Sequence, residues 1–106
     1  MKDFKPDFLL IPRPVYENKN LQPADRMVFG VIYWLEQLRE GVCRATNFSI
    51  GRVLGMHATS VQRSIANLEQ SGYISRELGK RNTRLIHCLV SFGRAEYRQP
   101  AVPGEV

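Results

Sequence analysis

The side chains best suited to hydrogen-bond a ligand lie in one polar segment between Ala58 and Gln70. At about 100° per residue, Ile65 and Leu68 fall within about 40° of Val61, so these three residues predict the buried face of a helix. The opposite face then carries Thr59, Arg63, Ala66, Asn67 and Gln70, with Ser60 and Gln62 on its flanks. Arginine can bind guanine through two hydrogen bonds, asparagine and glutamine can bind adenine, and small hydroxyl residues can contact phosphates. This pattern favours a helix that enters the major groove of DNA.

A polar outward face is also what a solvent-exposed helix requires, so a second interpretation of this segment stays open. Small side chains, the absence of lysine and the absence of an acidic residue before Glu69 favour close docking over solvation. His57 precedes the segment, at a position where serine or threonine is the usual helix cap. Its ring either contacts a phosphate or base or, as we favour, is exposed beside an imperfect cap. His87 is assigned a structural role in a strand.

Basic residues gather further along the chain, in and around the segment Gly79–Thr83. Apolar runs flank this segment, so it predicts the turn of a β-hairpin with a basic tip. Residues 57–84 hold five basic and two acidic side chains, which is +3 of the net +5 that the chain carries at pH 7. Contacts from such a tip to phosphates supply affinity more than specificity. The candidates for phosphate contacts are Lys80, Arg81 and Arg84 at the tip, with Arg52 and Arg44 upstream.

The spacing of glycines in front of the polar segment indicates a helix-turn-helix. In that motif a tiny residue in the first helix lets the second helix cross closely, a left-handed residue forms the turn, and an apolar residue anchors the second helix. Gly51, Gly55 and Val61 have the spacing for these three roles. We expect the first helix to begin near Thr46 or Asn47, since both are acceptable N-caps.

A longer amphipathic helix is predicted from Pro23 to about Glu40. Three aromatic residues widen its apolar stripe beyond the ~100° expected of a helix that rests on one core. A second surface must therefore cover it: an apolar run in the N-terminal arm, the same helix of a second subunit, or both together. The candidate dimerisation residues are Phe8, Leu10, Phe29, Tyr33 and Trp34.

The remaining segments complete a winged helix-turn-helix. Residues 1–20 are expected to form an irregular arm, in which Pro12 and Pro14 exclude a helix. We predict an α+β fold, mainly α, with three helices, a small antiparallel sheet and one wing. The predicted strands are Val42–Arg44, Tyr73–Leu78 and Leu85–Phe92. The predicted domain covers residues 21–92, and residues 93–106 form a flexible tail.

Other kinds of site are not indicated. Cys43 and Cys88 lie outside any metal-binding or redox spacing and are expected to be small buried side chains, brought together if the strand at Cys43 pairs with the last strand. There is no pair of clustered carboxylates and no phosphate loop, so we expect no enzyme, cofactor or small-molecule ligand. No apolar run approaches the ~18 residues of a membrane span, and we expect a cytoplasmic chain. The residues interpreted as solvated surface charges are Asp25, Glu36, Glu40, Glu69 and Glu77.

Four stretches carry a resemblance: Phe8-Leu9-Leu10-Ile11-Pro12, Leu21-x-Pro23-Ala24-Asp25-Arg26-x-Val28-Phe29-Gly30, Leu54-Gly55-Met56, and Val61-x-Arg63-x-Ile65-x-x-Leu68-Glu69-x-x-Gly72-Tyr73-Ile74. From about Phe8 to Phe92 the chain resembles a winged helix-turn-helix family of plasmid and phage replication proteins and related bacterial regulators. The resemblance implies replication initiation or control for a mobile element, or transcription regulation. Two positions depart from it, because His57 and Gln22 stand where small or hydroxyl caps are expected.

Together the residues and the resemblance predict a sequence-specific binder of double-stranded DNA that acts as a homodimer. The alternative is a winged helix that uses its helix or wing to bind another protein. DNA affinity that falls steeply with salt would favour the first hypothesis, and absent or salt-insensitive binding would favour the second.

Overall fold

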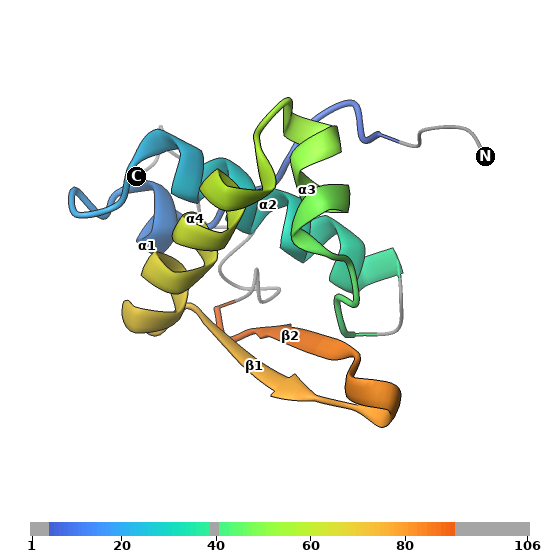
Figure 1. The fold of residues 1–106 in the computed structure, drawn as a ribbon. Coiled ribbons are helices and arrows are strands. Elements are labelled where there is room, and N and C mark those ends of the chain that lie inside the picture. The colour runs from blue at the N-terminus through green and yellow to red at the C-terminus, as the bar shows by residue number, and fades with distance from the viewer. Residues whose placement is uncertain (1–4, 39–40, 91–106) are drawn as a thin grey trace.

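The computed structural model describes residues 5–38 and 41–90 (Figure 1). Within these residues, α-helices come first and a β-hairpin with a 3-10 turn at its tip follows. In chain order the elements are α1 (Arg13–Tyr16), α2 (Pro23–Leu38), α3 (Asn47–Leu54), α4 (Ala58–Gln70), β1 (Ile74–Leu78), η1 (Lys80–Asn82) and β2 (Arg84–Cys88). The fold is α+β and mainly helical, and its order of elements is that of a winged helix, as predicted.

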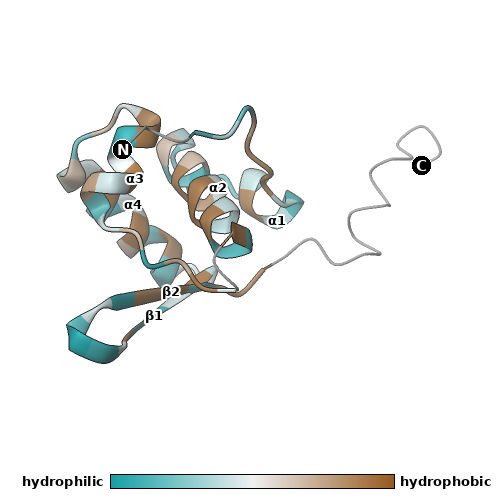
Figure 2. Ribbon diagram, turned by 90° about the vertical axis from the view of Figure 1, so that its right-hand side faces the viewer, coloured by the Kyte–Doolittle hydropathy of each residue, from teal (hydrophilic) through white to brown (hydrophobic). Residues whose placement is uncertain are grey.

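The core lies where α2 meets α3, α4 and the inner face of the hairpin. In Figure 2, α2 runs between α3 and α4 on one side and α1 on the other. Burying an aliphatic or aromatic side chain stabilises the fold by about 1.5–3 kcal/mol, so this shared core fixes the orientation of α4. Its largest fully buried side chains include Phe29 and Ile32 of α2, Ile50 of α3, Ile65 and Leu68 of α4, Ile74 of β1 and Ile86 of β2.

The N-terminal arm is more ordered than the sequence predicted. The expectation that Pro12 and Pro14 exclude a helix is wrong, because Pro12 is the N-cap of α1 and Pro14 lies in its first turn. Proline is tolerated there, since the first amides of a helix have no partner within the helix. Val15, on this single helical turn, is fully buried in the core. The arm is therefore part of the domain's packing.

The same arm covers the second side of α2. A Cβ atom built on Gly30 would lie 3.0 Å from Cβ of Leu9 and 3.4 Å from Cγ1 of Ile11, so the arm passes directly over the helix. Phe29, the neighbour of Gly30, is fully buried and stacks on Tyr33, with ring centroids 6.3 Å apart. The first of the two predicted coverings is thus present within one chain.

Two residues interpreted as solvated surface charges are buried. Asp25, 2% exposed, accepts the backbone N–H of Gln22 through Oδ2 at 2.9 Å. This bond satisfies the backbone N–H at the start of α2, where Gln22 stands in place of a hydroxyl cap. It is one of the two hydrogen bonds of a capping box. Glu36, 8% exposed, accepts the backbone N–H of Cys88 at 2.8 Å and so joins α2 to the end of β2. Both carboxylates are inside because a backbone donor meets them there.

The helix-turn-helix forms as the glycine spacing predicted. Thr46 caps α3, and its Oγ1 accepts the N–H of Ser49 at 3.0 Å. A Cβ atom on Gly51 would overlap the backbone oxygen of Met56. Gly55 has the left-handed φ of 72° that the turn requires. These local requirements place α4 directly after the turn.

The sheet is smaller than predicted. β1 and β2 pair antiparallel, with Ile74 opposite Cys88 and Leu78 opposite Arg84. The predicted strand at Val42–Arg44 is reduced to one bridge, between Cys43 and Ile86, because the chain turns at once into the Thr46 cap. Glu40, Phe92 and the predicted tail at 93–106 lie outside the described residues.

Candidate nucleic-acid interface

The outward face of α4 carries most of the side chains that the helical wheel placed there. Val61, Ile65 and Leu68 are fully buried, so the predicted inner face is confirmed. In Figure 2, α3, α4 and the tip of the hairpin lie on the same side of α2, and the tip is strongly hydrophilic. The exposed residues of α4 are Thr59, Gln62, Arg63, Ala66 and Gln70, while Ser60 is partly buried.

Arg63 is the cation at the middle of this face. Among the residues that the structure describes, its exposed guanidinium has no hydrogen-bond or ion-pair partner. His57, just before the helix, is exposed and its side chain makes no capping hydrogen bond, as the favoured interpretation expected. α4 therefore presents the five N–H donors of the Arg63 guanidinium beside hydroxyl and amide groups. Together these groups can hydrogen-bond to the edges of bases.

Asn67 does not fit the predicted role. It is partly buried, and its Nδ2 donates to Oδ2 of Asp25 at 3.3 Å. Because Asp25 also caps α2, Asn67 joins the C-terminal part of α4 to the first turn of α2. The assignment of Asn67 as an outward reader of bases is therefore wrong. The wheel missed it because residues at the edge of a helical face can turn toward a neighbouring helix.

The hairpin of β1 and β2 is the wing of the fold, and its tip is a tight turn that contains basic residues. Gly79 donates its N–H to the oxygen of Thr83 at 2.7 Å, and Thr83 donates to the oxygen of Lys80 at 3.1 Å. Between them Arg81 and Asn82 have φ angles of 60° and 59°, a left-handed conformation that costs an arginine about 1–2 kcal/mol. Within the described residues, the exposed side chains of Lys80 and Arg81 have no partner, so their charges face solvent.

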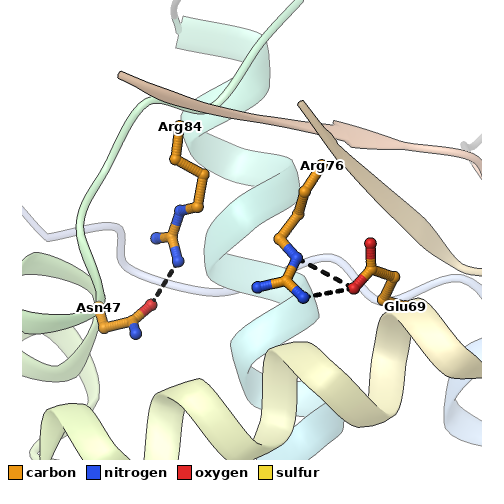
Figure 3. Close-up of polar contacts among 4 residues, drawn as sticks. All are labelled: Asn47, Glu69, Arg76 and Arg84. Carbon is orange, nitrogen blue, oxygen red and sulfur yellow. Dashed lines mark hydrogen bonds and ion pairs between the residues drawn. The ribbon is translucent and has the colours of Figure 1, made fainter. Parts of the chain in front are cut away.

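Arg84 differs from its predicted role as a free phosphate contact. Its Nη1 donates to Oδ1 of Asn47 at 2.7 Å (Figure 3). Its Nη2 donates to the backbone oxygen of Ala45, also at 2.7 Å. Partial burial lowers the pKa of this guanidinium, and the nearby positive charge of Arg76 lowers it further. Arg84 is therefore a tie between the wing and the start of α3. The sequence could not show this, because the acceptors lie far away along the chain.

A second tie joins the wing to α4. Nε and Nη2 of Arg76 donate to Oε1 of Glu69 at 3.0 and 2.5 Å, as Figure 3 shows. On the opposite face of the hairpin, Nε2 of His87 lies 2.9 Å from Oε2 of Glu77. Glu69 and Glu77 were interpreted as solvated charges. Glu77 is exposed, as predicted, although it contacts His87, whereas Glu69 is held in an ion pair with Arg76. Sequence reasoning missed Arg76, although its place on a strand beside the basic turn was a usable signal.

Arg52 and the candidate dimerisation residues differ in how far they are exposed to solvent. Arg52 is exposed on α3, and its guanidinium carbon lies 5.9 Å from the ring centroid of Phe48, a cation–π contact. Phe8 is 73% exposed and Leu10 is 39% exposed, so both are accessible to a partner. Tyr33 and Trp34 are half-buried, whereas Phe29 is fully buried. The assignment of Phe29 to a dimer surface is therefore wrong, because its side chain belongs to the core of its own chain.

The two cysteines are free thiols beside Glu36. Cys43 is buried and bridges to Ile86, so it pairs two residues away from Cys88. Burial raises the pKa of both thiols, and the Glu36 carboxylate raises it further. The expectation of a small buried side chain is confirmed for Cys43, whereas Cys88 is only partly buried. Among the described residues, no cluster of three metal-ligating side chains occurs, and no helix has the length and apolarity needed to cross a membrane.

Comparison with known proteins supports the fold. No family model matches the chain, and no curated protein matches it. A solved structure described as the N-terminal domain of a DNA binding protein is similar over 93% of this chain and 88% of that chain. The TM-score is 0.65 and the sequence identity is 16%. At this identity the likeness shows a shared fold.

Proposed function

We propose that this chain is a non-enzymatic, sequence-specific binder of double-stranded DNA. The observation that carries the proposal is that α4 and the basic wing tip lie on the same side of α2 (Figure 2). The exposed face of α4 carries Arg63, whose guanidinium has no partner among the described residues. A helix in the major groove beside a basic wing on the phosphates would use both surfaces at once. The similar fold of a DNA binding protein's N-terminal domain supports this proposal.

The two surfaces would contribute different properties. Arg63, Gln62 and Thr59 on α4 would read base edges through hydrogen bonds, with about 1–3 kcal/mol of discrimination for a good bidentate contact. Lys80 and Arg81 would contact phosphates, which are the same in every sequence. The resemblance to replication and regulatory proteins supports a role in replication control of a mobile element or in transcription regulation. Homodimers would place two such helices on neighbouring half-sites.

A selection from random duplexes with the purified chain tests the proposal. We expect one enriched sequence, and dissociation constants measured on that duplex should rise steeply with salt. Arg63→Ala should abolish the preference for the enriched duplex over a scrambled one while leaving weak binding. The matched control is Arg13→Ala, which removes an exposed arginine on α1, across α2 from α4.

The wing is tested by replacing Lys80 and Arg81 together with alanine. This variant should bind every duplex more weakly, and the slope of log K against log salt should become shallower by up to about 1.8 for two lost phosphate contacts. Equal losses on all duplexes for Arg63→Ala would contradict the groove assignment. No enrichment and no salt-dependent affinity would instead favour a protein partner.

A further inference from the structure

The seam between the wing and α4 contains an arginine held by a carboxylate. Arg76 projects from β1 toward the helices, beside Arg84 from β2 (Figure 3). Glu69, the only acidic residue of α4, meets it with one oxygen that accepts from both Nε and Nη2. Both side chains are 37% exposed, so the pair borders solvent along its length. Arg76 is therefore an accessible cation whose charge is neutralised within the chain.

The pair lies at the edge of the proposed DNA face. At about 100° per residue, Glu69 is close to Gln62 on the wing-side flank of α4, next to the outward face. Among the described residues, the hydrogen-bond acceptors of Arg84 are neutral: the oxygen of Ala45 and Oδ1 of Asn47. No carboxylate there balances its positive charge. The two neighbouring arginines of the seam therefore differ, because a carboxylate balances only Arg76. A phosphate that reached this seam would compete with Glu69 for Arg76.

We propose that Glu69 limits the DNA affinity of this domain by withholding Arg76 from the phosphate backbone. The inference rests on the proposed function, and it assigns to Glu69 a regulatory role at that same surface. A phosphate contact does not depend on sequence, so releasing Arg76 strengthens binding to every duplex by the same factor. Glu69 thereby lowers the affinity of the domain for DNA of any sequence.

The test compares Glu69→Gln with the wild-type chain on the selected duplex and on a scrambled one. One added phosphate contact makes the salt slope steeper by about 0.9, so the variant should lose about 3.5-fold more affinity than wild type when salt rises fourfold. It should also bind both duplexes more tightly at low salt. Glu77→Gln is the matched control, because it removes the same charge from the opposite face of the hairpin. This control should keep the wild-type slope, because it leaves the pair of Arg76 and Glu69 intact.

Glu69→Gln could strengthen binding either by releasing Arg76 or by removing a negative charge that repels DNA. The same change made in a chain without Arg76 separates these two effects. In a chain that already carries Arg76→Gln, adding Glu69→Gln should produce no further steepening of the slope. If the change persists there, or if Glu69→Gln behaves like Glu77→Gln, the inference is overturned while the proposed function stands. Tighter binding to the selected duplex alone would also overturn it, since that indicates a base contact. If the wild-type chain shows no salt-dependent affinity for any duplex, the proposed function itself fails.

Discussion

Gly51→Ala tests whether the close approach within the helix-turn-helix controls the stability of the domain. The new Cβ atom would lie well under 3.0 Å from the backbone oxygen of Met56, which real Cβ atoms essentially never do. Met56 cannot simply move aside, because its N–H donates to the oxygen of Gly51 at 2.9 Å. The turn that separates α3 from α4 must therefore shift as a unit, or that hydrogen bond must break.

The magnitude follows from three opposing contributions. Overpacking against fixed atoms costs about 1–3 kcal/mol, and loss of the turn's hydrogen bond costs about 1 kcal/mol. Alanine in place of glycine inside a helix returns about 1 kcal/mol. The free energy of unfolding should therefore fall by about 2 kcal/mol. Because α4 follows this turn directly, the variant should also lose affinity for the selected duplex.

Urea unfolding, followed by far-UV circular dichroism and by the fluorescence of the chain's single tryptophan, measures the change. Gly30→Ala is the matched control, since Gly30 is also helical and its Cβ would meet the side chain of Leu9 at 3.0 Å. The arm that carries Leu9 can yield more easily than a turn, so this control should change stability by less than about 1 kcal/mol. If Gly51→Ala is as stable as Gly30→Ala, the close approach does not constrain the fold as argued.

Three further predictions concern the wing and the thiols. Arg84→Gln should lower the free energy of unfolding by roughly 2 kcal/mol because two charge-assisted hydrogen bonds are lost, whereas Arg81→Gln should leave urea unfolding unchanged. Arg81→Gly should relieve the left-handed strain, so thermal unfolding stays at or above the wild-type midpoint while binding to a scrambled duplex weakens. Burial raises the pKa of the Cys43 and Cys88 thiols above the ordinary 9.0, so unfolded thiols ionise first and stability should fall as pH rises above about 9. Replacing both cysteines with alanine should remove this contribution to the fall, measured as the free energy of unfolding in urea at a series of pH values. If the fall with pH above about 9 is the same in this variant, the burial argument is contradicted.

The helices and the turn could be predicted from sequence because local chemistry decides them. The apolar period over residues 58–70 predicted both the bounds of α4 and its buried face, since only one face of such a helix can avoid water. Gly51 and Gly55 predicted the helix-turn-helix, because few other residues fit a close approach or a left-handed φ. The same rules misjudged Pro14, whose effect depends on where in a helix it falls.

The site was predicted only in part, because a side chain's partner is set by contacts between distant segments. The helical period and the predicted hairpin placed Arg63, Lys80 and Arg81 on the surface, and within the described residues these exposed side chains have no partner. These patterns cannot distinguish them from Arg84 and Arg76, which the structure ties to groups on α3 and α4.

The sequence by itself therefore determined the three longer helices α2, α3 and α4, which face of α4 is apolar and where the surplus positive charge lies. Only the tertiary structure decided which polar side chains remain available to a ligand. Asn67 is withdrawn by Asp25, and Arg76 by Glu69, across 42 and 7 residues of chain respectively. Periodicity follows from the geometry of one helix, whereas a hydrogen bond requires two groups to meet. That meeting depends on how the elements pack.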